Sequence, residues 1–302
     1  DCRIGLSPDK FILSYCDRAL GITSAEEQPV LPKGNNLSLH LLELFTSQVA
    51  KVGMTDGIRQ VLQEESDALR AYYEQAGILI ARPAGGTSCR LAISAKGGTN
   101  AENHNHNDVG SYAVALGSET MVGDQGGPNS YPGDYFNGDA PQKYKIKGSF
   151  GHPVPVVDGR TQSSGGKAKG VVLQKEFTNE KDVFSIDYTS AYSTPNLDKL
   201  IRTFVYDRQG EGNFTVGDEF TAKTPIRFET AITTRADWKI LDDTHLLLAT
   251  DSEQMIVAIE ASGKVAFTSE TIEVNSPAYT RIGIALKNQS KEGYIRLKMY
   301  TK

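Results

Sequence analysis

The chain has 302 residues and a formal net charge of −5 at pH 7, with 39% apolar and 23% charged residues. This length allows one large domain or two, and the composition is ordinary for a globular protein. The acidic balance and the lack of a dense Lys/Arg stripe argue against nucleic acid, although a locally positive cleft can still bind a polyanion. No apolar run approaches the ~20 residues that span a bilayer. We expect no signal peptide, because residues 11–20 carry polar side chains and lack a basic leader.

The three cysteines, Cys2, Cys16 and Cys89, are widely spaced and form no C-x-x-C pair. This spacing excludes a zinc knuckle and a disulfide framework. Cys2 and Cys16 can form one disulfide if the chain is exported, and the alternative is that all three are buried or free thiols. The cysteines therefore leave the compartment open.

Residues 1–75 have helical periodicity. Ser7-Pro8 is a helix-starting pair, and Gly21 ends the apolar stripe that follows it. Two further stripes consist of Leu37, Leu41, Leu44, Phe45 and Val49, and of Ile58, Val61, Leu62, Leu69 and Tyr72. We predict three short helices that belong to a larger helical layer. An isolated three-helix domain is the alternative.

Residues 76–302 have the period of two that is typical of strands. Two predicted strands, Gly77–Arg82 and Cys89–Ser94, flank a turn at Pro83–Gly86. After His152, turn residues separate further strand-like runs: Gly170–Phe177, Val183–Tyr192, Leu200–Tyr206, Asn213–Phe220, Ile226–Thr233, Leu246–Thr250, Met255–Glu260, Val265–Thr268, Arg281–Leu286 and Tyr294–Tyr300. No helical pattern intervenes to make parallel crossovers, so we predict a mainly β fold with a large antiparallel β-sandwich.

The stretch Ala101–Gly127 contains the densest group of chemically active side chains. Its run H-N-H-N-D sets His104, His106 and Asp108 at alternate positions. Alternate side chains of an extended strand share a face, and His104 would then lie about 7 Å from His106. We therefore predict one strand face that carries all three, continuing into Gly110–Val122.

His106, Asp124 and His152 are candidate ligands of a divalent metal. Two imidazoles and a carboxylate suit zinc with a fourth position left for water or another ligand. Asp124 lies in V-G-D-Q-G-G, where glycines let the backbone approach an ion. His104 is the acid–base candidate beside them, and Asp108 is interpreted as scaffold. The spacing is less specific than a compact motif such as H-E-x-x-H, and lone histidines are more often structural.

The loop 126–151 is rich in Gly, Pro, Asn and Tyr, and loops of this length are usually functional or mobile. Tyr131, Tyr135 and Phe136 alternate there with polar residues, a composition that suits stacking on sugar rings. The alternative is a loop packed on its own aromatic rings. Candidate partners for a substrate carboxylate or sulfate are Arg82 and Arg202, although most strand arginines are solvated or salt-bridged.

Three motifs resemble the heparinase II/III-like family of polysaccharide lyases. They are N-H-N-H-N-D-V-G-S-Y-A-V-A-L-G, V-G-D-Q-G-G-P-N-S-Y-P-G-D-Y and S-F-G-H-P-V-P-V-V-D-G. The likeness covers roughly residues 72–220, and the remainder matches only in its β-rich character.

The resemblance implies an α/α toroid followed by an antiparallel β-sandwich, with a cleft between them. It matches His106, Asp124 and His152 to the metal positions, usually filled by zinc, and His104 to a histidine that contributes to catalysis. It places Tyr131 and Tyr135 in a loop that can line the cleft, which is a weaker match. The implied reaction is β-elimination on a uronic acid of an acidic polysaccharide, by a protein exported to the periplasm or cell surface.

The chain departs from that family at its N-terminal end. About 75 helical residues are too few for a toroid, so we expect this chain to be the C-terminal part of a longer protein. The family's catalytic tyrosine, and the Asn or His that contacts the carboxylate, would then lie outside it, and the chain alone is expected to be inactive.

Two other functions use the same residues. One is a non-catalytic carbohydrate-binding or structural β-sandwich with a stabilising metal, and the other is metal-dependent hydrolysis. The sequence leaves open the uronate polymer, endo or exo action, the native metal and the oligomeric state.

Overall fold

A computed structural model describes residues 69–302 of the chain, apart from residues 103, 125, 129 and 274–277. The three predicted helices and the possible Cys2–Cys16 disulfide lie almost wholly outside the described residues. Cys89 is a buried free thiol.

The last turn of the third predicted helix is a strand instead. Tyr72 lies in β1 (Arg70–Tyr73), which pairs in antiparallel fashion with β2 (Ile78–Ala81). The Tyr72 ring packs edgewise on Phe184 with a centroid separation of 5.8 Å. Its helical spacing in the sequence is therefore overridden by packing against the core.

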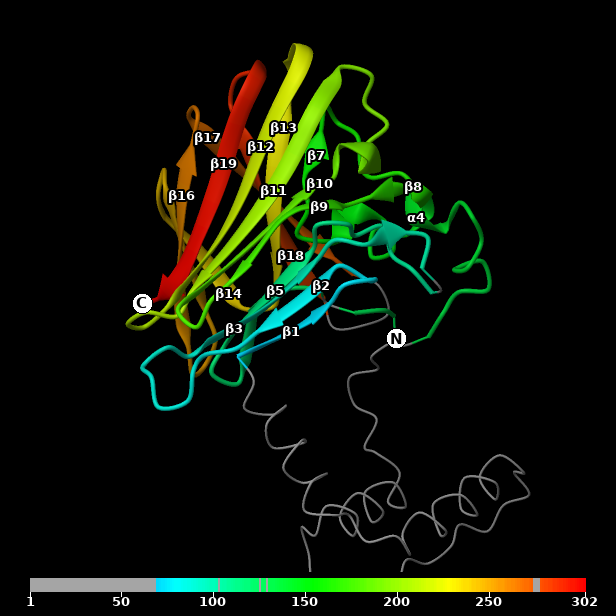
Figure 1. The fold of residues 1–302 in the computed structure, drawn as a ribbon. Coiled ribbons are helices and arrows are strands. Elements are labelled where there is room, and N and C mark those ends of the chain that lie inside the picture. The colour runs from blue at the N-terminus through cyan, green and yellow to red at the C-terminus, as the bar shows by residue number, and fades with distance from the viewer. Residues whose placement is uncertain (1–68, 103, 125, 129, 274–277) are drawn as a thin grey trace, which may run out of the picture. The chain divides into compact units, whose positions relative to one another are not determined.

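Three large sheets, all built from antiparallel pairs, make up the described part of the chain (Figure 1). The eight-stranded sheet has the order β14 (Asp237–Asp242), β15 (His245–Ala249), β16 (Gln254–Ala261), β19 (Ser290–Thr301), β12 (Asn213–Ile226), β11 (Leu197–Asp207), β10 (Lys181–Asp187), β9 (Val171–Phe177). The five-stranded sheet has the order β1, β2, β3 (Leu91–Lys96), β5 (Tyr112–Leu116), β6 (Glu119–Val122). The four-stranded sheet has the order β17 (Val265–Ile272), β18 (Tyr279–Leu286), β13 (Phe228–Thr234), β7 (Val156–Val157).

Short elements complete the described chain: the pair β4 (Thr99–Asn100) and β8 (Gly165–Lys169), the helix α4 (Ala140–Lys143), and the 3-10 turns η1 (Ser149–Gly151) and η2 (Thr189–Ala191). No helix among residues 69–302, gaps excepted, is long and apolar enough to cross a membrane.

One hydrophobic core is shared by the three large sheets. The five- and four-stranded sheets are joined where the Gly123 N–H donates to the Thr233 carbonyl at 3.0 Å. The Tyr112 ring of β5 lies 6.2 Å from Phe204 of β11 and 5.9 Å from Phe214 of β12. These contacts across the layers confirm the predicted antiparallel β-sandwich.

Burial follows the sequence pattern strand by strand. In β3, buried and half-buried residues alternate, as expected of a strand with one face on the core. In β13 and β18 nearly every residue is buried, polar side chains such as Thr230, Thr233 and Arg281 included. The sequence did not predict β14, whose side chains are almost all exposed and so show no alternation.

Arg202 was predicted to contact substrate, and the structure places it in the core instead. Its guanidinium is fully buried and donates to both carboxylate oxygens of Asp218 at 2.7 Å. It also donates to the carbonyls of Gly110 and Pro153, both at 2.7 Å. Burial opposes the charge, but Asp218 outweighs it and raises the pKa of Arg202. No face of Arg202 is left for a sugar, so its role is structural.

We predict that Arg202→Leu lowers the free energy of unfolding by about 3–5 kcal/mol, because Asp218 would be left as an uncompensated buried charge. Urea denaturation followed by tryptophan fluorescence measures this change. The matched control is Arg296→Leu, since Arg296 pairs with Glu219 and Glu260 at the surface. That variant should lose about 1 kcal/mol or less, and equal losses in the two variants would contradict the prediction.

Candidate metal centre and adjoining cavity

Three segments that are distant in the sequence bring His106, Asp124 and His152 together. His106 follows β4, Asp124 follows β6, and His152 follows η1. One ligand atom from each of these side chains lies within 4.8 Å of the others. The rings of His106 and His152 are 5.2 Å apart between centroids. The structure therefore gathers the three residues that the sequence nominated.

The prediction that His104, His106 and Asp108 share a strand face is wrong. Residues 104–110 form turns and irregular backbone, and His104 has a left-handed φ of 57°. His104 is exposed, His106 is half-buried, and Asp108 is buried in an ion pair with Lys96. The alternation failed as a guide because this segment forms no regular strand ladder. The N–H groups of Asp108 and Val109 donate to side chains, and that of Asn107 donates to the Lys147 carbonyl of another loop. Asp108 has the scaffold role that was predicted for it.

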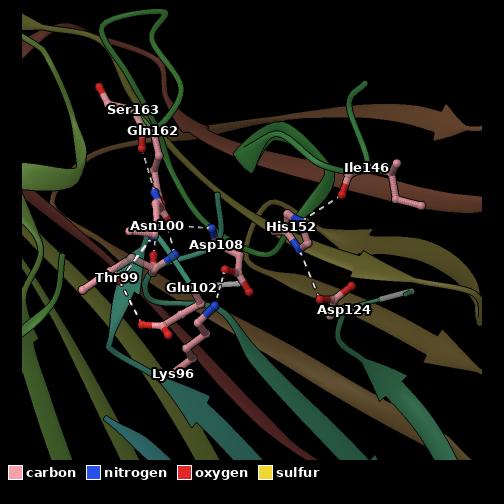
Figure 2. A network of polar contacts seen from close by, with 12 residues as sticks. Lys96, Thr99, Asn100, Glu102, Asp108, Asp124, Ile146, His152, Gln162 and Ser163 are labelled. Atoms are coloured by element: carbon pink, nitrogen blue, oxygen red, sulfur yellow. Dashed lines mark hydrogen bonds and ion pairs between the residues drawn. The ribbon is translucent and has the colours of Figure 1, made fainter. Parts of the chain in front are cut away.

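Buried amide groups hold this loop in place (Figure 2). The Asn100 side chain donates to Gln162 at 2.9 Å and accepts from the Asp108 N–H at 3.0 Å. Gln162 in turn accepts from the Val109 N–H at 3.1 Å and donates to the Val109 carbonyl at 2.7 Å. Satisfied buried polar groups of this kind fix one backbone conformation, so the position of His106 is set by residues outside its own segment.

His152 has a defined tautomer. Its ring is fully buried, and Nε2 lies 3.1 Å from the Ile146 carbonyl oxygen, which can only accept, so Nε2 carries the proton (Figure 2). In the neutral ring Nδ1 is then a bare lone pair. This nitrogen has no hydrogen-bond partner among the described residues and lies 3.6 Å from an Asp124 carboxylate oxygen. Two acceptors that face each other in this way require a cation between them or a proton on the histidine.

The other two side chains are also in forms that bind metal. Burial, together with repulsion by His152, lowers the pKa of His106 to about 4, so its imidazole is neutral at pH 7. Partial loss of solvation opposes the charge on Asp124, whose side chain is still 42% exposed, but His152, His106 and the Gly126 N–H together lower the pKa of its carboxyl. Neutral imidazoles and an ionised carboxylate are the states that zinc binds.

The donor set therefore fits zinc. A histidine ligand usually donates its second N–H to a carbonyl or carboxylate, as His152 does to Ile146. Tetrahedral zinc at ordinary bond lengths needs ligand atoms about 3.4 Å apart. Small side-chain movements from the present separations would close the site, and a fourth position would stay open.

A surface cavity of about 420 Å³ includes His104 in its wall. The other lining residues are mainly amides and aromatic or small groups: Asn100, Glu102, Asn105, Asn107, Phe136, Asn137, Gly138, Pro141, Lys147 and Ser164. Phe136 is half-exposed, and its ring lies 5.1 Å from that of His104 in an edge-to-face arrangement. An exposed ring surrounded by amides is the composition that binds sugars.

Tyr135 connects the cavity wall to the metal ligands. It is 1% exposed, its hydroxyl lies 3.2 Å from His106 Nε2, and its ring packs on Tyr131 and Phe136. Burial raises its pKa well above the usual value. Tyr135 is thus placed to orient His106, whereas the ring that faces the cavity belongs to Phe136. Tyr131 is half-buried against both rings, so the loop largely packs on its own aromatics.

Arg82 directly follows β2 and is not among the residues that line the cavity. Its backbone bonds to Leu69 and to the side chain of Arg208. The structure therefore does not bring Arg82 to His104.

Sequence reasoning missed Lys147 and the bracing amides Asn100 and Gln162. Lys147 lies five residues before His152 in K-I-K-G-S-F-G-H, and proximity to a candidate ligand was the available signal. Asn100 and Gln162 are 62 residues apart, so nothing in the local sequence indicates their bond.

Comparison with solved structures identifies the fold. No protein-family model matches the chain, and no curated protein matches it in sequence. The crystal structure of heparinase III is similar with a TM-score of 0.61 and 18% identity, covering 77% of this chain and 36% of that one. Heparan sulfate lyase HepC from Pedobacter heparinus is similar with a TM-score of 0.65 and 14% identity, covering 87% of this chain and 42% of that one. The fold is therefore heparinase-like, as the sequence motifs indicated.

The chain spans about two fifths of the length of these solved relatives. The part that it matches is the C-terminal part of those chains. At identities below one fifth, this likeness shows the fold alone, because one fold can host unrelated functions.

We predict that the protein purified without chelator carries about one zinc ion per chain, and that Asp124→Ala weakens zinc affinity at least 100-fold, since it removes a direct ligand. Elemental analysis and competition with a chromogenic chelator measure both quantities. His245→Ala is the control, because His245 pairs with Asp242 at the surface and lies outside the cluster. A folded parent protein that binds no zinc would contradict the prediction.

We predict that the zinc-free protein loses stability as the pH falls from about 6.5 to about 4. The folded state keeps His106 neutral down to a pKa of about 4, whereas the unfolded chain takes up a proton near its ordinary value. The loss can reach about 3 kcal/mol from this residue alone. Urea unfolding at pH 7.5 and 4.5 measures the change in the free energy of unfolding. The His106→Asn variant should show a smaller change between these pH values, and the control His245→Asn should show the same change as the parent.

Proposed function

We propose that the chain is the β-sandwich part of a polysaccharide lyase that cleaves a uronic-acid-containing glycan by β-elimination. The observation that carries the proposal is the position of His104. It lines a polar and aromatic cavity, two residues from a His/Asp/His cluster that fits zinc, within a heparinase-like fold. The solved structures with this fold include heparinase III and a heparan sulfate lyase.

The reaction removes the proton at C5 of a uronate and breaks the bond between C4 and the oxygen of the leaving sugar. The electron pair of the C5–H bond forms the C4=C5 double bond, and the leaving oxygen takes up a proton. Each proton transfer needs a positioned acid or base. Neutralising the uronate carboxylate stabilises the carbanion-like state at C5.

His104 is the described residue best placed for proton transfer. It is exposed in the cavity wall, and the braced loop holds it two residues from His106. Its left-handed backbone at φ 57° turns its side chain away from the path of a regular strand. Such an uncommon conformation is retained where the surroundings enforce it. His104 would exchange a proton with the sugar, and Phe136 would support a sugar face.

The role of His106, Asp124 and His152 is to hold a metal, most suitably zinc, which supplies fixed positive charge and links three loops when it is bound. Through the loop 104–108, that link would keep His104 in place. Tyr135 orients His106 through its hydroxyl. Tyr131 and Arg82 stay weaker candidates for contact with distant parts of the glycan.

The longer protein would supply the other half of the cleft. The chain spans about two fifths of the solved relatives, so a toroid with a catalytic tyrosine and an Asn or His for the carboxylate is proposed outside it. The isolated chain should then bind zinc and show little or no turnover. Such an enzyme would act in the periplasm or at the cell surface, where acidic polysaccharides occur.

A non-catalytic sandwich that binds glycan and carries a stabilising metal is the second candidate. Tyr135 favours it, since this phenol is buried and bonded to the candidate ligand His106 instead of facing the cavity. The two candidates differ in whether His104 is needed for turnover or only for binding.

We predict that His104→Ala in the longer protein lowers lyase turnover at least 100-fold, because it removes an acid–base group, and leaves zinc content unchanged. Ultraviolet absorbance of the unsaturated uronate measures turnover, and elemental analysis measures zinc. His245→Ala is the matched control, with full activity expected.

The product itself discriminates between the mechanisms. An unsaturated uronate marks elimination, whereas a saturated new reducing end marks hydrolysis and overturns the proposal. Full turnover by the isolated chain would show that no residues outside it are required.

A further inference from the structure

Lys147 is a buried cation that the metal centre does not use. The residue is 7% exposed, and its Nζ donates to the Tyr135 carbonyl at 2.5 Å. The ammonium lies 4.8 Å from the centroid of the Tyr135 ring and 4.9 Å from that of Phe136. None of the described carboxylates pairs with it.

The lack of a carboxylate partner sets Lys147 apart from neighbouring lysines. Lys96, Lys143 and Lys145 each have a carboxylate partner, although all three are more exposed than Lys147. Burying an ammonium without a counter-ion is costly, and ring faces and one carbonyl offset only part of that cost. Burial accordingly lowers the pKa of Lys147. Two of its three N–H bonds have no acceptor among the described residues.

The cavity beside His104 is bounded in part by Lys147. Lys147 lines it together with His104 and Phe136. The Lys147 carbonyl accepts from the Asn107 N–H at 2.9 Å, which ties its backbone to the loop that carries His104. A ligand in this cavity would therefore lie against Lys147, His104 and Phe136 together.

The remaining polar groups leave room for an anion at Lys147. The carboxylate in the lining belongs to Glu102, which is exposed and accepts from the Thr99 hydroxyl at 3.0 Å. The side-chain oxygen of Asn105 is buried, has no hydrogen-bond partner in the described part of the chain, and is left to accept from a sugar hydroxyl. Lys147 is thus the lysine of this cavity wall, and Glu102 is its carboxylate. Apart from these two and His104, the lining side chains are neutral.

We infer that Lys147 is the anion-binding residue of this cavity and that it pairs with the carboxylate or sulfate of the acidic sugar seated beside His104. The inference rests on the proposed function and deepens it. It assigns the choice of an acidic over a neutral glycan to a residue of the β-sandwich, through a charge-assisted hydrogen bond that the free protein lacks.

The test measures binding of three tetrasaccharides to the full chain by titration calorimetry. The first alternates glucuronate with N-acetylglucosamine, the second is its carboxyl-reduced form, and the third is the carboxyl-reduced form carrying sulfate groups. The parent should prefer the first or the third over the second. In Lys147→Met the ratio of the affinity for the acidic tetrasaccharide to that for the carboxyl-reduced one should fall about ten- to hundredfold. Lys147→Arg should retain most of this ratio.

Lys145→Met is the matched control, because Lys145 is two residues away, exposed, and paired with Glu270. It should keep the parent's preference. Lys147→Gln provides a second neutral variant that can still donate to the Tyr135 carbonyl, in case the methionine variant fails to fold. Thermal unfolding and zinc content confirm that each variant keeps the metal centre.

The outcomes separate the two levels of the proposal. If a neutral Lys147 variant loses the preference for the first tetrasaccharide, Lys147 binds the carboxylate. If it loses the preference for the third, Lys147 binds a sulfate. An unchanged preference in the neutral, folded variants overturns the role of Lys147 alone. A parent that binds none of the tetrasaccharides overturns the proposed function together with this inference.

Discussion

The site depends on one buried guanidinium. Arg202 is bound to Asp218 inside the sandwich, and the same side chain donates to the carbonyls of Gly110 and Pro153. Gly110 ends the loop that carries His104 and His106, and Pro153 directly follows His152. A single ion pair therefore fixes the two histidine-bearing segments to the rigid core. An arginine suits this position, since its planar fork can satisfy a carboxylate and two carbonyls at once.

Gly110 shows how closely the chain packs around that pair. It has a φ of 87°, and a Cβ there would lie 3.3 Å from the Tyr188 ring and 3.6 Å from Arg202. Any other residue would be strained in backbone conformation and crowded against the Tyr188 ring. The loop can turn back toward the site only because glycine stands at this point.

The electrostatics of the site divide into two neighbouring parts. In the first, Nδ1 of neutral His152 and the Asp124 carboxylate face each other as acceptors, an arrangement that requires a metal ion between them or a proton on His152. In the second, Lys147 presents a cation without a carboxylate partner among the described residues, an arrangement that calls for an anion. Tyr135 lies between them, with its hydroxyl on His106 and its carbonyl on Lys147. One residue thus links the proposed metal centre to the proposed sugar-binding cavity.

The sequence by itself determined the β-sandwich and the identity of the clustered His106, Asp124 and His152. Alternating apolar side chains predict the strands. The motifs around the three residues resemble those of a known family. It did not determine the conformation of the H-N-H-N-D loop or the fates of Arg202, Tyr135 and Lys147. Those were decided by tertiary structure, since burial and pairing depend on partners such as Gln162 and Asp218 from other strands and loops. A residue type limits what a side chain can bond to, and only the folded chain decides which partner is within reach.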